Sequence, residues 1–495
     1  FISCLLILAS CTSNQSSQIQ YPVTKKVDTV DNYFGTKIAD PYRWLENDTS
    51  AETALWVKDE NKITFDYLSE IPYRRQIKDK LTQIWNFEKH YTPFKKGKYY
   101  FFYKNDGIQN QNVLYFQEGL NGVPKILIDP NKFSADGTVS LSGISIREDG
   151  KYIAYNVSKS GSDWTDIHIM DIDKGITSDT ILWVKFSDAS WKGDGFYYST
   201  YPAPELTKGG TYSGKNENKK VFYHKLDTKQ KEDKIVYEDK NRPGIGWSVS
   251  VTDDENFMCL WGIESTSGAS FAVKSLSSLK NTTEENTWKW VDTSFKYEYN
   301  VIDNIGNFLF VHTNKNAPKW QLILIDPAKP EIKNWKIIIP ESNDPLESVS
   351  FCGGKIVAKY LHDVTNKLFI YDISGKMEKE ISLPDLGITN FSSDKKDSIA
   401  FYSFTNYTTP TTIYKYNINT NSAELFFKPK IDFVTDDYES KQVFYASKDG
   451  TKIPMFITYK KGIKMDGNNP CFLYGYGGFN ASMTPWFSIV NSVFL

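Results

Sequence analysis

The chain contains the stretch Gly150-Lys151-Tyr152-Ile153-Ala154-Tyr155, which is followed after a polar loop by Ile167-His168-Ile169-Met170-Asp171. The first stretch begins at a turn glycine, and both are rich in aromatic and β-branched residues, as expected of two β-strands. The same unit of turn, aromatic strand, polar loop and second apolar strand recurs along the chain. Further copies begin at Gly97, Gly193, Asp254, Gly306, Gly354 and Asp397.

Seven copies at intervals of about 40 to 60 residues fit the four-stranded blades of a propeller. The sequence therefore predicts a seven-bladed β-propeller over residues 93–431. A pair of large β-sandwiches is the alternative interpretation. Leucine-rich and helical solenoids are excluded, because neither is built from aromatic strands of period two.

A helical pattern precedes the repeats, in the segment 21–92. From Asp40 to Phe87, apolar residues recur at steps of three and four between charged residues, and Pro72 divides the pattern into two pieces. This periodicity predicts an N-terminal helical segment.

A different strand pattern follows the repeats. The apolar runs 442–445, 453–459 and 471–474 predict the first strands of an α/β sheet rather than an eighth blade. Residues 432–495 are therefore interpreted as the start of a further domain that is not finished at Leu495.

The composition excludes some classes of function. The 495 residues carry a formal charge of −2, and the lysines are scattered rather than clustered, so nucleic-acid binding is not expected. The widely spaced cysteines Cys259, Cys352 and Cys471 indicate neither a disulfide framework nor a metal site, and core packing is expected for them. The carboxylate pairs Asp253-Asp254 and Asp436-Asp437 are interpreted as turn residues. No metal and no cofactor is expected.

The N-terminal stretch reads as the end of a signal peptide. An apolar run ends in Leu8-Ala9-Ser10-Cys11 and is followed by polar residues. This resembles the lipobox of bacterial lipoproteins, which implies that Cys11 is lipidated and anchors the protein in the bacterial cell envelope, facing the periplasm or the cell surface. Residues 1–20 are thus predicted to be signal peptide and tether. An ordinary cleaved secretory signal is the alternative.

A glycine-rich segment, Tyr474-Gly475-Tyr476-Gly477-Gly478-Phe479-Asn480, follows the third predicted strand. Glycines at the end of a buried strand permit positive φ and close backbone approach, and that edge of an α/β sheet is where ligand sites form. A tyrosine hydroxyl there stays protonated near neutral pH and suits the stabilisation of an oxyanion. Without further context, tyrosines that cap a hydrophobic core explain the pattern as well.

The same segment resembles the YGYGGFN segment of the prolyl oligopeptidase family, and three other stretches agree in the family's order: 40–46 (DPYRWLE), 160–164 (SGSDW) and 447–455 (SKDGTKIPM). The resemblance implies a serine peptidase in which a seven-bladed propeller caps an α/β-hydrolase domain and excludes folded proteins. The helical segment 21–92 and the segment 432–495 would then both belong to this α/β-hydrolase domain, which is incomplete in this sequence. The resemblance further implies short, proline-containing peptides as substrates, cleaved on the carboxyl side of proline by a Ser-Asp-His triad. We expect a monomer.

The resemblance also implies roles for three residues. Tyr476 matches the tyrosine that supplies one oxyanion-hole donor, Phe479 matches an aromatic residue of the specificity pocket, and Phe186 matches a propeller phenylalanine that reaches toward bound peptide. The sequence contains no GxSxG nucleophile elbow, so the triad is expected downstream of Leu495 and this fragment alone is expected to be inactive.

Two alternatives stay open at this point. One is a surface-anchored propeller lipoprotein that binds a protein or a glycan, because propellers are often binding platforms. The other is a basic-specific peptidase of the oligopeptidase B type, which shares the propeller.

Overall fold

The computed structural model describes residues 19–202, 215–276, 287–479 and 481–493. The described residues form two compact units, one up to Lys80 together with Lys215, and the other from Leu81 to Pro202 and from Asn216 onward. Cys11 lies outside the described residues, so its lipidation stays a prediction. No helix in the described part of the chain is long and apolar enough to cross a membrane.

The first unit contains a hairpin, a 3-10 helix and an α-helix: β1 (Val30–Tyr33), β2 (Thr36–Ala39), η1 (Arg43–Glu46) and α1 (Ala51–Ser69). The hydroxyl of Ser50 accepts a hydrogen bond from the Thr53 backbone N–H and so caps α1. Arg43 forms ion pairs with Asp31 and with Asp40, which hold the turn between the hairpin and η1. A further helix, α2 (Arg74–Trp85), starts in this unit and ends in the second.

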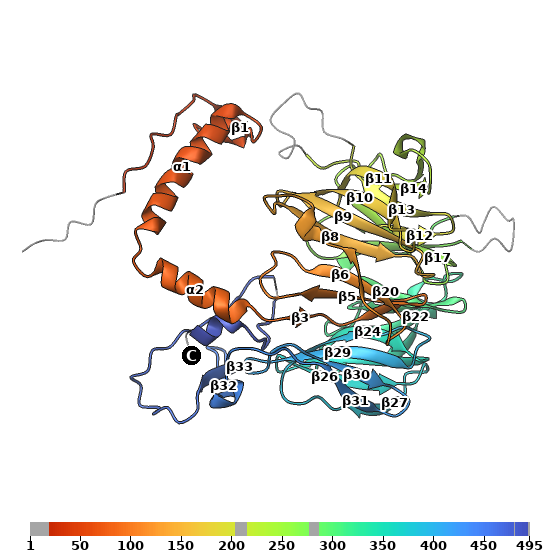
Figure 1. Ribbon diagram of the computed structural model, residues 1–495. Coiled ribbons are helices and arrows are strands. Elements are labelled where there is room, and N and C mark those ends of the chain that lie inside the picture. The colour runs from red at the N-terminus through yellow and green to blue at the C-terminus, as the bar shows by residue number, and fades with distance from the viewer. Residues whose placement is uncertain (1–18, 203–214, 277–286, 480, 494–495) are drawn as a thin grey trace, which may run out of the picture. The chain divides into compact units, whose positions relative to one another are not determined.

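The second unit contains seven antiparallel sheets of four or five strands, each built from consecutive strands, besides a two-stranded hairpin (Figure 1). Blade 1 consists of β3 (Lys89–His90), β4 (Phe94–Lys96), β5 (Tyr99–Asn105), β6 (Val113–Glu118) and β7 (Lys125–Ile128). Blade 2 consists of β8 (Val139–Ile146), β9 (Tyr152–Lys159), β10 (Trp164–Asp171) and β11 (Ile176–Lys185). Blade 3 consists of β12 (Ser190–Lys192), β13 (Gly195–Thr200), β14 (Lys220–Lys225) and β15 (Lys234–Tyr237). Blade 4 consists of β16 (Gly246–Val251), β17 (Phe257–Ile263), β18 (Ala269–Ser275) and β19 (Lys289–Tyr297).

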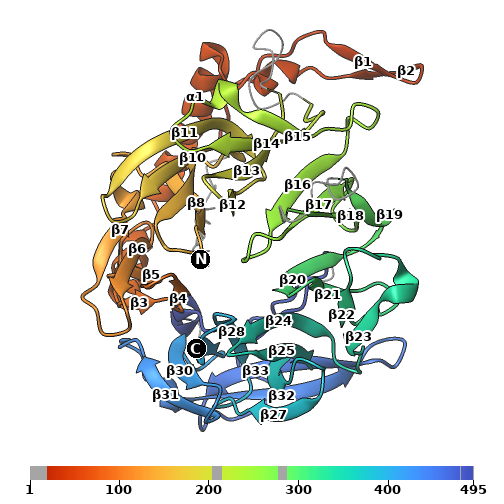
Figure 2. The same cartoon turned by 90° about the vertical axis from the view of Figure 1, so that its right-hand side faces the viewer.

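The remaining three blades repeat the arrangement. Blade 5 consists of β20 (Tyr299–Ile305), β21 (Phe308–Thr313), β22 (Gln321–Ile325) and β23 (Lys336–Ile339). Blade 6 consists of β24 (Leu346–Cys352), β25 (Lys355–His362), β26 (Thr365–Tyr371) and β27 (Met377–Ile381). Blade 7 consists of β28 (Ile388–Ser392), β29 (Ile399–Thr405), β30 (Thr412–Asn417) and β31 (Ser422–Phe427). The first strands β8, β12, β16, β20, β24 and β28 lie nearest the centre of the ring (Figure 2).

The two strands of each sequence repeat are the middle strands of a blade. In blade 2, for example, β9 pairs with β10, and Ile153 and Ile167 are fully buried. Seven clusters of buried side chains fill the seven junctions between adjacent blades. Both faces of these middle strands are therefore buried against the neighbouring blades. The predicted seven-bladed β-propeller is confirmed.

The ring closes between blades 1 and 7 without a shared strand. Tyr100, Phe401 and Ile413 form the buried cluster at this junction. An ion pair of 2.8 Å between Lys95 and Asp397 also joins the two blades. Side-chain contacts therefore close the ring between blades 1 and 7, whereas strand pairing holds each single blade together.

The segment after the propeller corrects one expectation. The runs 442–445 and 453–459 lie in the hairpin of β32 (Tyr438–Ala446) and β33 (Lys452–Lys460), but 471–474 forms no strand. A strand needs a partner for its N–H and C=O groups and cover for its apolar side chains, and no described strand pairs with this run. Leu473 and Tyr474 are accordingly exposed.

The cysteines also differ between the propeller and the segment that follows it. Cys259 and Cys352 are buried in the propeller as expected, whereas Cys471 is exposed. The expectation of core packing is wrong for Cys471, because it begins the uncovered segment.

Candidate functional site

The loop between β11 and β12 presents Phe186 in an unusual conformation. Phe186 has a φ of 52°, in the left-handed region that non-glycine residues rarely adopt, and its side chain is 64% exposed. Lys219 donates a hydrogen bond of 2.8 Å from Nζ to the Phe186 carbonyl oxygen. Trp183, three residues earlier, also has a positive φ of 64°, and Thr200 donates a hydrogen bond to its carbonyl oxygen. Partners from β13 and from just before β14 therefore hold this loop in place.

Lys219 is the least expected of these partners. It is only 5% exposed, and burial lowers the pKa of its ammonium to about 8. Its Nζ lies 5.6 Å from the centre of the Tyr201 ring. A buried lysine of this kind needs hydrogen-bond acceptors, and the Phe186 carbonyl supplies one. Sequence reasoning missed Lys219, because it lies 33 residues from Phe186 and belongs to no motif.

Two stacked tryptophan rings lie close to Phe186. The rings of Trp164 and Trp183 stack with their centres 4.4 Å apart. Lys185 Nζ lies 5.1 Å from the centre of the Phe186 ring and 5.5 Å from that of Trp164, and it pairs with Asp163 at 3.6 Å. Trp164 and Asp163 belong to the SGSDW motif, so this motif supports the surroundings of Phe186.

Phe186 lines a cavity of about 570 Å³ between blades 2, 3 and 4. Most of the other lining residues are polar: Ser142, Asn156, Ser162, Asp163, Thr165, Ser187, Asp188, Ser190, Ser248 and Ser250. The cavity therefore offers one exposed aromatic ring and many hydrogen-bonding groups.

A second cavity of about 310 Å³ shares Ala189 and Ser190 with the first. Its charged lining residues are Lys96, Glu148, Asp253 and Glu255, and they lie at or just after the ends of β4, β8 and β16. Unlike the first cavity, this one is bordered by ion pairs between blades.

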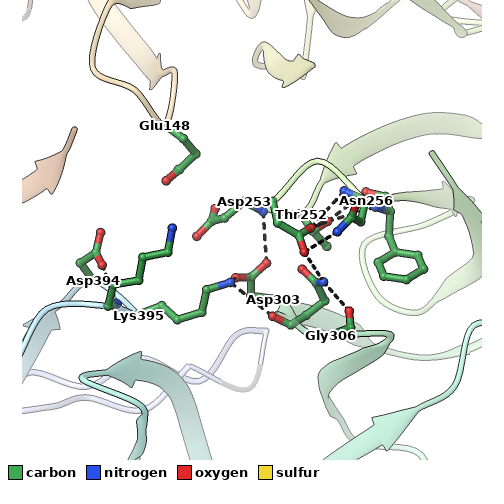
Figure 3. A network of polar contacts seen from close by, with 12 residues as sticks. Glu148, Thr252, Asp253, Asn256, Asp303, Gly306, Asp394 and Lys395 are labelled. Carbon is green, nitrogen blue, oxygen red and sulfur yellow. Dashed lines mark hydrogen bonds and ion pairs between the residues drawn. The ribbon is translucent and has the colours of Figure 1, made fainter. Parts of the chain in front are cut away.

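Figure 3 shows the network around this second cavity. Lys395, at the turn after β28, pairs with Asp303 on β20 of blade 5, and Lys96 pairs with Glu148 and lies 3.9 Å from Asp253. The Asp253 backbone N–H donates a hydrogen bond of 3.1 Å to Asp303. Burial, reinforced by the negative charge of Asp253, raises the pKa of Asp303. The lysines thus hold together carboxylates from several blades.

The glycine-rich segment places its predicted site residues in solvent. Tyr476 is 52% exposed and Phe479 is 87% exposed. The positive φ expected of a glycine here falls on Phe479, at 53°. A Cβ at Gly478 would lie 3.1 Å from the Tyr476 hydroxyl oxygen, so a glycine leaves room for that group. No described residue hydrogen-bonds the hydroxyl, and the roles of Tyr476, Phe479 and Phe186 stay predictions.

The histidines have partners within the second unit. His224 is fully buried, with Nδ1 2.8 Å from Asp233 and Nε2 3.6 Å from Asp179. The partners of the other four are Glu88 for His90, Thr180 for His168, the Leu346 carbonyl for His312, and Asp344 for His362. Each of the five histidine rings is thus held by a neighbouring group.

The carboxylate pairs lie at turns or in a short helix. Asp254 accepts hydrogen bonds from Thr252, Asn256 and Asn304 at the turn after β16, and Asp436-Asp437 ends the short helix η5 (Thr435–Asp437). Among the described residues, no cluster of three or more His, Cys, Asp or Glu residues could hold a metal ion.

Known proteins resemble the chain over nearly its whole length. The family model "Prolyl oligopeptidase, N-terminal beta-propeller domain" matches residues 21–429. The prolyl endopeptidase of Elizabethkingia meningoseptica is 44% identical over 98% of this chain and 68% of its own length. Prolyl oligopeptidase A of Amanita bisporigera is 31% identical, again over 98% of this chain and 68% of its own length.

Solved structures also resemble the chain over nearly its whole length. A chain from an analysis of two prolyl endopeptidases has a TM-score of 0.84 and 31% identity, over 95% of this chain and 68% of that chain. Prolyl oligopeptidase B of Galerina marginata, bound to a 35-residue hydrolysis and macrocyclization substrate, has a TM-score of 0.83 and 30% identity, over 95% and 69%. Oligopeptidase B of Leishmania major shares the fold, with a TM-score of 0.77 at 18% identity over 96% and 70%.

Proposed function

The chain belongs to the prolyl oligopeptidase family, and from this premise we propose that it works in a serine peptidase that cleaves short peptides after proline. One observation carries the proposal: a prolyl endopeptidase matches 98% of the chain at 44% identity, across the propeller and the segments on both sides of it. A propeller that serves only as a binding platform would have no need of those flanking segments.

Specificity for proline is favoured over specificity for basic residues. The relatives and structures with 30% identity or more that are named above are prolyl endopeptidases or prolyl oligopeptidases, whereas the oligopeptidase B structure reaches 18%. The propeller is proposed to limit the size of the substrate, so that short peptides reach the site and folded proteins do not.

Within this enzyme, Tyr476 is proposed to donate a hydrogen bond to the oxyanion that forms when the scissile carbonyl is attacked. Such a donor binds the transition state more strongly than the substrate, because negative charge develops on that oxygen during the reaction. Phe479 and Phe186 are proposed to contact the peptide. The 495 residues contain no GxSxG elbow, so the chain by itself is proposed not to hydrolyse peptides.

The test of Tyr476 needs a form of the protein that contains a catalytic serine. Suitable forms are the product of the whole gene, or a hybrid in which this chain replaces the aligned part of the Elizabethkingia meningoseptica enzyme. Tyr476→Phe is expected to lower kcat on a blocked Gly-Pro substrate by about 10²- to 10³-fold with little change in KM.

Tyr474→Phe is the matched control, since Tyr474 lies two residues away and is also exposed. A Tyr476→Phe enzyme as fast as its parent would rule out the oxyanion role. Absence of cleavage after proline in the parent enzyme itself would count against the function.

We also propose that Cys11 carries a lipid that anchors the protein in the bacterial cell envelope. The support is the sequence Leu8-Ala9-Ser10-Cys11 at the end of an apolar run. Wild-type protein expressed with its signal segment is expected to incorporate radioactive palmitate and to sediment with membranes, and Cys11→Ala protein is expected to do neither. Peptide binding needs no second subunit in this proposal, and light scattering of the purified protein tests the expected monomer.

A further inference from the structure

Asp188 is a carboxylate of the Phe186 cavity without a partner among the described residues. It lies two residues after Phe186 and lines the same cavity. Its side chain is accessible, yet no described residue forms an ion pair or a hydrogen bond with its carboxylate oxygens. The surrounding protein raises the pKa of Asp188, and burial is the cause of that shift. The carboxylate is therefore accessible at the cavity and has no cation beside it among the described residues.

The lysines near Asp188 are engaged elsewhere. Lys185 pairs with Asp163 at 3.6 Å and lies over the rings of Trp164 and Phe186. Lys219 donates its hydrogen bond to the Phe186 carbonyl. Both ammonium groups are thus engaged by other residues of the cavity, and neither pairs with Asp188.

The walls around Asp188 leave its carboxylate room. A Cβ at Gly143 would lie 2.7 Å from Asp188 Oδ1, so the absence of a side chain at this position opens the space beside the carboxylate. Asn156 donates a hydrogen bond of 3.0 Å to the Ser187 carbonyl oxygen, and the Ser187 hydroxyl accepts one from the Ser199 N–H. Both bonds fix Ser187, the residue before Asp188, and so hold the loop at the cavity.

We propose that Asp188 is a binding subsite for a positively charged group of the bound peptide, either its α-ammonium or the side chain of a Lys or Arg residue. The proposal rests on the proposed function and adds a preference that the residues from the sequence motifs do not supply. A peptide whose apolar part lies on Phe186 would bring its charge to Asp188, two residues away in the same cavity. A carboxylate at a protein surface attracts such a charge more strongly than a carboxylate in bulk water.

Binding of four matched peptides to the 495-residue chain tests the subsite without any need for catalysis. The peptides share one short proline-containing sequence and a fluorescent label, and they differ in two features. The N-terminus is free or acetylated, and one residue is Lys or norleucine. Fluorescence anisotropy at low salt then gives a dissociation constant for each peptide, and the comparison of single changes shows which charge Asp188 recognises.

Wild-type chain is expected to bind at least one singly charged peptide about fivefold more tightly than the neutral peptide. Asp188→Asn is expected to abolish this preference and to bind the neutral peptide as wild type does. Asp163→Asn is the matched control, because Asp163 lines the same cavity but already pairs with Lys185. It is expected to keep the preference.

Three results would overturn the subsite: an equal preference in Asp188→Asn, an equal loss in Asp163→Asn, or no measurable binding of any of the four peptides. None of them bears on cleavage after proline, which is measured separately with the Tyr476→Phe pair. Conversely, an enzyme that fails to cleave after proline would remove the proposed function, and the charge preference of the chain would still be measured.

Discussion

Two adjoining cavities of the propeller differ in whether a lysine lies beside their carboxylates. In the network around the smaller cavity, Lys96 and Lys395 face the carboxylates Glu148, Asp253 and Asp303, which come from different blades. In the larger cavity, Asp188 has no cation among the described residues. Both Asp303 and Asp188 have a pKa raised by burial, but only Asp303 has a lysine against it.

The difference separates structural charges from a charge available to a ligand. A buried carboxylate with a lysine beside it holds two turns together, and the loss of either partner leaves an unpaired charge. A carboxylate without a partner contributes nothing to the fold and has a desolvation cost. A protein tolerates such a group most readily where a ligand supplies the missing charge.

The largest expected effect comes from breaking the paired region. Lys395→Met leaves Asp303 buried beside Asp253 without its cation, and is expected to lower the free energy of unfolding by about 3 kcal/mol. Urea denaturation of the 495-residue chain measures the change. Lys396→Met, at the exposed neighbour, is the control and is expected to change the value by less than about 0.5 kcal/mol. Equal stabilities for the two variants would show that the network does not hold the ring together.

A second paired site gives a pH dependence of known sign. Burial alone would lower the pKa of His224, but the hydrogen bond and charge of Asp233 and the charge of Asp179 raise it. Because the folded pKa is the higher one, the stabilisation is present below about pH 6.5 and is lost as the pH rises through the folded pKa. The loss is about 1.4 kcal/mol for each unit by which the pKa is raised.

His224→Gln removes this titration and tests it. The variant is expected to be less stable than wild type at pH 6, with a difference that shrinks toward pH 9. Denaturation at a series of pH values gives both curves. Parallel curves would mean that His224 is neutral in the folded protein throughout this range.

The larger cavity should respond mainly in binding. Lys219→Met removes the hydrogen bond to the Phe186 carbonyl and frees the loop, so affinity for the neutral proline peptide is expected to fall by about threefold to tenfold. Stability is expected to change little, because the loss of the bond is offset by removal of a buried charge. Lys240→Met, at an exposed lysine, is the control. Unchanged affinity in Lys219→Met would contradict a positioning role.

The smallest expected effect is the change in the free energy of unfolding caused by Asp188→Asn. Asp188→Asn removes an uncompensated charge, so the free energy of unfolding at pH 7 is expected to stay the same or to rise by less than about 0.5 kcal/mol. Asp254→Asn is expected to lower it, since hydrogen bonds from Asn304, Thr252 and Asn256 lower the pKa of Asp254 against the effect of burial. A clear destabilisation by Asp188→Asn would mean that Asp188 is structural after all.

The sequence predicted the propeller because its evidence is local. Each repeat carries the alternation of its own two middle strands, and Ile153 and Ile167 occupy the buried positions that this alternation predicts. The run 471–474 carried an equally apolar pattern and forms no strand, since its formation depends on neighbouring strands. Tyr476, Phe479 and Phe186 were named through motifs, whereas Lys219 and Asp188 belong to none.

The sequence by itself determined the seven blades, the flanking segments and the family, because these depend on the periodicity and motifs of contiguous residues. Only the tertiary structure decided which charges meet. The hydrogen bond from Lys219 to Phe186 and the pairing of Lys395 with Asp303 join residues that are 33 and 92 positions apart. The isolation of Asp188 is a property of the same kind, because a charge is paired or left free by the closure of the ring around it.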